Sequence, residues 1–205
     1  MPAPMIPDPM TPTRVISIRP SMLPTGSFGR ELGVADSILP RGYLRTLPPR
    51  ARTVVKEHRR RLLRDGGGRV LDLGGDPGHL PLYPASAEVV AGDGDGPFDH
   101  IVSILHLTGL ADPAAELDRV RHALAPDGAF VFLEPVTDPG FGGRGQRLIA
   151  PAVGRLAGWR PDRDVPALVR DAHLVMSELV RTPMPRYVWP LTDLVEGRAH
   201  HRVAP

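Results

Sequence analysis

The sequence has no cysteine, a single lysine and few aromatic residues. Its 205 residues include two Trp, three Tyr and five Phe. The lack of cysteine excludes disulfides, thiolate metal sites and cysteine nucleophiles, and nothing points to an oxidising compartment. No stretch stays apolar long enough to cross a bilayer, and prolines interrupt the N-terminal residues where a signal peptide would lie. We therefore expect a cytoplasmic protein without stable membrane insertion.

The positive charges are almost all arginines, although the formal net charge is only +2. Several of them gather between residues 50 and 64, where Arg52, Lys56, Arg59 and Arg60 share one face at helical spacing. No aromatic residues interleave them, so we expect no nucleic-acid partner. A solvated helix face explains the cluster, and contact with a phosphate-rich or anionic membrane surface is the alternative.

The chain divides near residue 48. Residues 1–48 are rich in proline and glycine and have weak periodicity, which predicts a leader that is partly disordered or loosely packed. Residues 49–205 have the patterning of one folded domain, and a chain of this size can bury a sizeable core.

Short apolar runs alternate with amphipathic segments in the second part. Strands are predicted for residues 69–73, 87–93, 98–107 and 129–135. Helices are predicted from Pro49 to the glycines at 66–68, over 112–128 with Asp112 as the cap, and over 143–159 and 164–174. The tail predicts two antiparallel strands at one edge of the sheet. The expected fold is α/β: a Rossmann-like, doubly wound, mostly parallel sheet with fewer strands and helices than usual and a C-terminal antiparallel hairpin.

A glycine-rich turn, "DLGGDPG" at residues 72–78, follows the first of these strands. In open α/β sheets, ligands bind at the carboxyl ends of the strands, where glycines let the backbone approach them. The glycines do not have the GxGxxG spacing of nicotinamide-binding domains. The turn resembles the first motif of class I S-adenosylmethionine-dependent methyltransferases, an acid followed by GxGxG.

The blocks that follow strengthen the resemblance. "FDHIVSILHLTGLADPAAELDRVRHALAPDGAFVFLEP" is similar to the fourth strand, helix and fifth strand of that family. "HRRRLLRDGGGRVLDLGG" and "LPLYPASAEVVAGD" look like its small-molecule branch, near the ubiquinone-biosynthesis and thiol methyltransferases. The similarity covers roughly residues 55–200.

The resemblance implies S-adenosylmethionine as the cofactor and assigns residues to it. Asp72 would orient its methionine end, Gly74 and Gly78 would let the backbone pass close to it, and Gly75 belongs to the same cofactor-binding set. Asp93, at the end of the second strand, would accept hydrogen bonds from the ribose hydroxyls.

The chain departs from the family pattern in two places. Asp76 replaces the middle glycine of the motif and adds a negative charge to the cofactor-binding set; it could repel the cofactor's carboxylate, approach its sulfonium or turn to solvent. The middle region is also shortened, because only "GDGP" separates Asp93 from the next strand. The leader, or a partner subunit in a homodimer, could supply the missing part of the adenine pocket.

His106 and Glu134 are the candidate catalytic residues, since both lie near carboxyl ends of strands. His106 could act as a base toward a hydroxyl acceptor, or be a partly buried structural histidine. Glu134 could act in the site, or cap a helix or meet an arginine. Five aromatic residues could line an acceptor pocket, although core packing is the favoured role for most of them: Tyr83, Phe141, Trp159, Tyr187 and Trp189. His173, His200 and His201 form no spaced metal motif, so no metal is expected.

Two functions fit these features. The first is an S-adenosylmethionine-dependent methyltransferase that acts on a small-molecule acceptor. The second is a catalytically degenerate methyltransferase-like module that binds a ligand or a partner.

Overall fold

The structure is a computed structural model that describes residues 16–18, 48–138, 140–185 and 189–202. The helices are α2 (Pro49–Arg64), α3 (Pro113–Ala123), α4 (Phe141–Ala157) and α5 (Val165–Asp171), with 3-10 turns η1 (Leu80–Leu82) and η2 (Leu107–Gly109). The strands are β1 (Ile16–Ile18), β2 (Gly68–Asp72), β3 (Ala87–Ala91), β4 (Phe98–Ile104), β5 (Leu124–Val136), β6 (Leu174–Pro183) and β7 (Asp193–His201).

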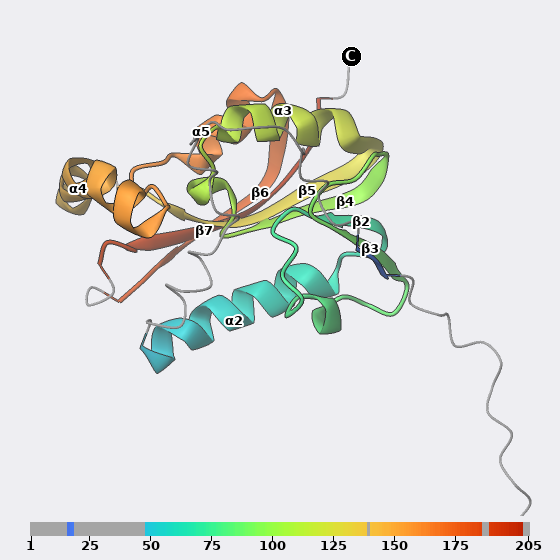
Figure 1. Ribbon diagram of the computed structural model, residues 1–205, viewed down its shortest axis with the longest axis horizontal. Helices are drawn as coiled ribbons and strands as arrows, with labels where there is room; N and C mark the ends of the chain where they lie inside the picture. The colour runs from blue at the N-terminus through green and yellow to red at the C-terminus, as the bar shows by residue number, and fades with distance from the viewer. Residues whose placement is uncertain (1–15, 19–47, 139, 186–188, 203–205) are drawn as a thin grey trace, which may run out of the picture.

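The strands form one twisted sheet in the order β1-β3-β2-β4-β5-β7-β6. The first five of these are parallel, and β7 pairs antiparallel with both β5 and β6. Helices cover both faces: α3 and α5 lie on one face and α2 on the other (Figure 1). The predicted α/β fold, Rossmann-like and mostly parallel with an antiparallel C-terminal pair, is therefore confirmed.

Alternation along the strands divides the core into two layers. Successive side chains of a strand point to opposite faces, so Val70 packs on the α2 side while its neighbour Leu71 packs on the α3 side. Both side chains are almost completely buried. A strand buried on both faces is therefore apolar throughout, which explains the continuous apolar run that the sequence shows here.

The helices begin where the sequence predicts. Asp112 caps α3 by accepting a hydrogen bond from the amide of Ala115 at 3.0 Å, and Asp164 caps α5 in the same way through Ala167. A proline occupies one of the first two positions of each of these helices, where its missing N–H costs nothing. Among the described residues, no helix is long and apolar enough to cross a membrane.

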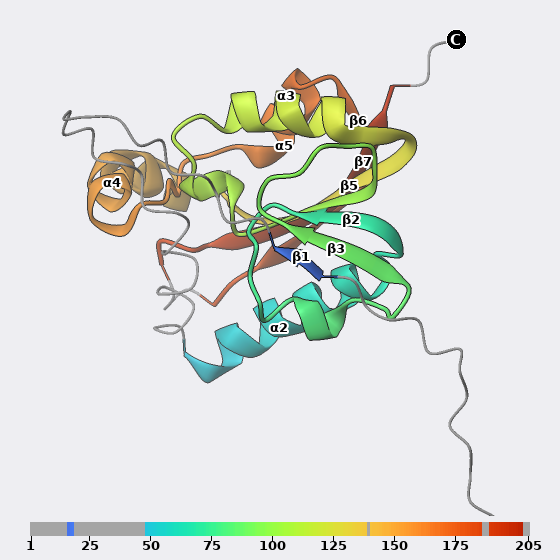
Figure 2. The same ribbon diagram turned by 45° about the vertical axis from the view of Figure 1, so that its right-hand side comes forward.

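Two features of the sheet concern the middle region, which the sequence predicts to be shortened. Residues 92–97, between β3 and β4, contain neither helix nor strand. At the outer side of β3, the edge position is taken by β1 from the predicted leader, with Ile16 opposite Val89 and Ile18 opposite Ala91 (Figure 2). The rest of the leader lies outside the described residues, and the predicted boundary at residue 48 stays a prediction.

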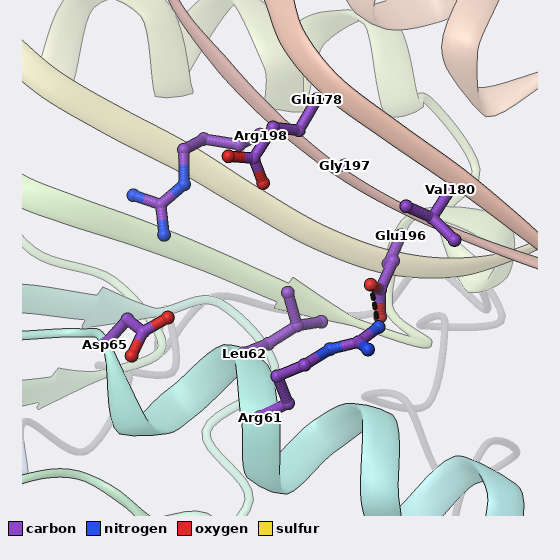
Figure 3. A pocket seen from close by; sticks show the side chains of 8 residues that line it. All are labelled: Arg61, Leu62, Asp65, Glu178, Val180, Glu196, Gly197 and Arg198. Carbon is purple, nitrogen blue, oxygen red and sulfur yellow. Dashed lines mark hydrogen bonds and ion pairs between the residues drawn. The ribbon is translucent and has the colours of Figure 1, made fainter.

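A buried carboxylate ties α2 to β7. Glu196 accepts a hydrogen bond from His58 at 2.6 Å and forms an ion pair with Arg61. The contact lies beside a pocket of about 100 Å³ between α2 and strands β6 and β7, whose walls carry both positive and negative side chains (Figure 3). This pocket lies beside the central part of the β6–β7 pair and includes no residue of the glycine-rich turn.

Candidate functional site

The glycine-rich turn lies between the carboxyl ends of β3 and β4. A methyl group at Gly74 would lie 3.9 Å from the carbonyl oxygen of Ile104, the last residue of β4. Gly75 has a φ of +54°, which favours glycine, and a methyl group there would lie 3.5 Å from the amide nitrogen of Gly92, just after β3. The turn thus approaches the ends of both neighbouring strands, as a ligand site in an open α/β sheet requires.

No α-helix follows the turn. The three-residue η1 takes its place, and Tyr83 then leads toward β3. The site therefore lacks the helix N-terminus that binds phosphate groups in dinucleotide-binding folds.

Asp72 is buried, and its hydrogen bonds are made within the protein. One carboxylate oxygen contacts His79 Nδ1 at 2.7 Å and accepts a bond from the Tyr83 hydroxyl at 3.0 Å. The other accepts a bond from the amide of Gly75 at 3.2 Å. Burial, followed by the charge of Asp72, raises the pKa of Tyr83, so this hydroxyl stays protonated and keeps donating. Asp72 thus shapes the turn from inside.

Asp76 also takes part in the turn. Its Oδ1 accepts a hydrogen bond from the amide of Gly78 at 2.9 Å, and its Oδ2 lies 4.0 Å from His79 Nε2. The side chain of Asp76 is 27% exposed, while that of His79 is 3% exposed. His79 therefore lies between two carboxylates, and the residue that replaces the motif's middle glycine has local partners.

Asp93 is the most accessible of the three acids that the sequence assigns to the cofactor, the others being Asp72 and Asp76. Its side chain is 82% exposed and forms an ion pair with Arg119 of α3 at 3.0 Å. Arg119 also pairs with Glu116 at 2.6 Å, and the Glu116 hydrogen bond raises the pKa of Arg119. A solvent-exposed pair is worth little energy, so Asp93 can exchange this arginine for another donor at small cost.

The loop after β4 is held rigidly by Glu134. This carboxylate, at the end of β5, is fully buried. It accepts hydrogen bonds from the Ser103 hydroxyl at 2.7 Å and from the amides of His106 and Leu107 at 2.9 and 3.0 Å. Thr108 adds longer bonds from its amide and its hydroxyl. The geometry favours the capping alternative for Glu134, since these donors occupy both oxygens.

Arg163 holds the same loop through the loop's carbonyl oxygens. Its guanidinium donates hydrogen bonds to the carbonyl oxygens of Leu107 and Leu110. Within the loop, Leu105 has a φ of +53°, a conformation that is costly for a leucine. Such strain persists only where the surroundings enforce it, and it occurs often at functional sites.

His106 follows Leu105 directly. Its side chain is 13% exposed, and Nε2 lies 3.9 Å from a Glu116 carboxylate oxygen. Its Nδ1 is buried and has no hydrogen-bond partner among the described residues. A buried polar atom without a partner is costly, and it marks a place where a ligand could supply the missing bond.

The structure brings most of the predicted residues to one edge. Asp72, Gly74, Gly75, Asp76, Gly78 and Asp93 lie in or beside the turn, with His106 and Glu134 at the adjoining strand ends. Sequence reasoning missed His79, although it stands in the motif segment seven residues after Asp72. It also missed Arg119 and Arg163, since the contact of Arg119 with Asp93 and those of Arg163 with the loop after β4 join distant segments and leave no pattern in the sequence.

The aromatic residues that the sequence suggested for an acceptor pocket differ in their exposure. Tyr83 and Trp159 are buried, while Trp189 is 48% exposed. The side chain of Phe141 and all of Tyr187 lie outside what the structure describes. In the parts of the chain that are described, no group of three or more His, Asp or Glu side chains could hold a metal ion.

Comparison with solved structures identifies the fold as that of class I methyltransferases. The chain aligns with the N-methyltransferase NodS from Bradyrhizobium japonicum with a TM-score of 0.52 and 15% identity, over 74% of this chain and 96% of that one. It aligns with the YcgJ protein from Bacillus subtilis with a TM-score of 0.55 and 10% identity, over 75% and 100% of the two chains. For the mitomycin 7-O-methyltransferase MmcR, the TM-score is 0.50 at 14% identity, over 72% and 54%. No protein-family model and no curated protein matches the sequence.

Replacing Glu134 with Gln should destabilise the protein. The amide keeps the shape of the carboxylate, but its NH₂ group replaces one hydrogen-bond acceptor with a donor that faces the donors of the loop. The free energy of unfolding should fall by about 2 kcal/mol. Urea denaturation would measure the loss, with Glu178→Gln on the exposed face of β6 as the matched control. Equal stability of the two variants would contradict the role assigned to Glu134.

Proposed function

We propose that this protein is an S-adenosylmethionine-dependent methyltransferase that acts on a small molecule bearing a hydroxyl group. The observation that carries the proposal is the buried Nδ1 of His106, which has no hydrogen-bond partner among the described residues and lies on a loop fixed beside the glycine-rich turn. The fold supports it, because its structural neighbours are named as methyltransferases that act on nitrogen and on oxygen.

The described residues fit the cofactor in three respects. Gly74 and Gly75 leave the backbone of the turn uncovered by side chains of their own. Asp93 is exposed at the end of β3, where ribose hydroxyls could replace Arg119. The carboxylates around the turn also match the positive charge of a sulfonium. When bound, S-adenosylmethionine supplies an electrophilic methyl group.

His106 would act on the acceptor. Its free ring nitrogen can accept the proton of an acceptor hydroxyl as the oxygen attacks, which raises the nucleophilicity of that oxygen. Glu116, 3.9 Å from the other nitrogen, would then stabilise the imidazolium. Glu134 and Arg163 would act as positioning residues, because they fix the backbone that carries the ring. Correct placement is the larger part of catalysis in a displacement of this kind.

A non-catalytic methyltransferase-like module is the second candidate. Asp72 favours it, because its carboxylate is buried and already bonded to His79, Tyr83 and the turn, away from a ligand. The additional carboxylate of Asp76 also favours this candidate, since it could repel the cofactor's own carboxylate.

Calorimetric titration with S-adenosylhomocysteine tests the cofactor site first. We expect measurable binding, weakened about tenfold in Asp93→Ala because the ribose loses its charged acceptor. Asp118→Ala is the matched control: it lies on α3, is 62% exposed and pairs with Arg121, away from the turn. Equal affinities of the two variants would remove Asp93 from the site.

Asp76→Gly separates the two candidates. The substitution restores the family's glycine and removes one negative charge, so S-adenosylhomocysteine should bind several-fold more tightly if Asp76 obstructs its carboxylate. Parallel titrations of the natural and substituted proteins measure the ratio. Absence of binding by both proteins would support the non-catalytic module and place the defect in the shortened region.

His106→Asn tests the proposed base. Transfer of a labelled methyl group to a panel of small hydroxylated compounds should fall by about a hundredfold or more, while affinity for S-adenosylhomocysteine stays unchanged. The control His122→Asn changes an exposed histidine of α3 and should leave both quantities unaltered. Undiminished transfer by His106→Asn would exclude it as the base.

A further inference from the structure

Helix α4 presents an exposed face that combines arginines with apolar side chains. The exposed positions follow helical spacing, with one or two in every turn. Leu148, in the middle of this face, is 83% exposed, more than the other exposed large hydrophobic side chains that the structure describes. The α4 surface consists of Arg144, Arg147, Leu148, Pro151, Ala152 and Arg155.

Contacts made by the opposite, buried face of α4 determine which side of the helix is exposed. Gln146 is 1% exposed; its side-chain nitrogen donates to the Pro190 carbonyl at 2.8 Å and to the Thr192 hydroxyl at 3.0 Å. Its oxygen accepts a bond from the amide of Asp138 at 2.8 Å. Ala150, one turn further on, is completely buried. The helix cannot turn Leu148 inward without breaking these bonds.

The charge of α4 has one sign. Its 17 residues contain three arginines and no aspartate or glutamate. The acids on either side are used locally: Asp138 accepts a bond from the amide of Gly140, and Asp162 forms a bidentate pair with Arg160. The α4 surface is therefore complementary to a negatively charged partner.

A half-exposed tryptophan borders the α4 surface. The ring of Trp189 would lie 3.6 Å from a methyl group at Gly145, so it lies against the N-terminal half of the helix, and it is 48% exposed. Tryptophan, leucine and arginine together are typical of segments that lie in a membrane interface, where an apolar side chain enters the headgroup region and the cations meet lipid phosphates.

From these observations we propose that the α4 surface docks onto anionic lipid membranes. A protein partner would need a pocket shaped for Leu148, whereas a lipid surface adapts to a convex helix. In Figures 1 and 2, α4 lies at one end of the molecule. The attachment is peripheral and reversible, since one such helix face supplies limited affinity. This proposal does not depend on methyl transfer.

Co-sedimentation with vesicles tests the proposal. The full chain should bind to vesicles of phosphatidylcholine mixed with phosphatidylglycerol. It should bind much less to vesicles of phosphatidylcholine alone, and binding to the mixed vesicles should weaken as salt is added. Arg147→Gln and Leu148→Ser should each lower the partition coefficient about fivefold. Trp189 fluorescence should shift to shorter wavelength on binding, whereas the buried Trp159 contributes a constant background.

Matched controls come from exposed side chains elsewhere. Arg170→Gln, at the end of α5, removes an exposed arginine, and Leu179→Ser, on β6, removes an apolar side chain that is 47% exposed. Both should bind vesicles as the natural protein does. The proposal is overturned if no vesicles bind at low salt, if both lipid compositions bind equally, or if α4 variants and controls lose binding alike.

Discussion

The buried carboxylate of Glu134 is the contact on which the arrangement of the carboxyl edge depends. Glu134 belongs to β5, where Leu133 pairs with Ile104 of β4 and Glu134 itself with Val195 of β7, so its position is set by the sheet. A charge at such a place is tolerated only if hydrogen bonds replace its hydration. The loop after β4 supplies them by turning its amides inward, and this requirement holds His106 in place.

At the end of β2, hydrogen bonds likewise replace the hydration of the buried carboxylate of Asp72. It too is buried and fully bonded, to His79, Tyr83 and Gly75, so it acts on the turn from within. Asp76 and Asp93 differ, because their carboxylates reach the surface. Of the three acids assigned to the cofactor, Asp72 therefore builds the turn, whereas a ligand can approach Asp76 and Asp93. This difference depends on their burial and not on their spacing in the sequence.

The sequence was sufficient for the fold class, but not for the edge strand β1 or for the contacts of the site. Periodicity and turn residues predicted the strands and the capped helices, because those signals are local. The partners of Asp72 were not predictable, since His79 and Tyr83 meet it only through the path of a turn that lacks its α-helix. The hydrogen bonds between Glu134 and the segment that carries His106 join residues 26 to 31 positions apart. Arg163 binds carbonyl oxygens of the loop from 53 and 56 positions away. Likewise, β1 joined the sheet from a segment whose composition predicted no strand.

The distribution of charge bears on which ligand the turn suits. Charge is unevenly distributed among the described residues: the carboxylates of Asp72, Asp76, Asp93 and Glu116 lie around the carboxyl edge, where Arg119 pairs with two of them, and further arginines lie on the outer faces of α2 and α4. A dinucleotide would bring a negative pyrophosphate to this edge, which has acids and only the short η1 in place of a helix N-terminus. A ligand with a positive centre meets the opposite situation, because each carboxylate attracts it. The acids at this edge thus argue against a dinucleotide independently of the glycine spacing, and they support the proposed sulfonium ligand.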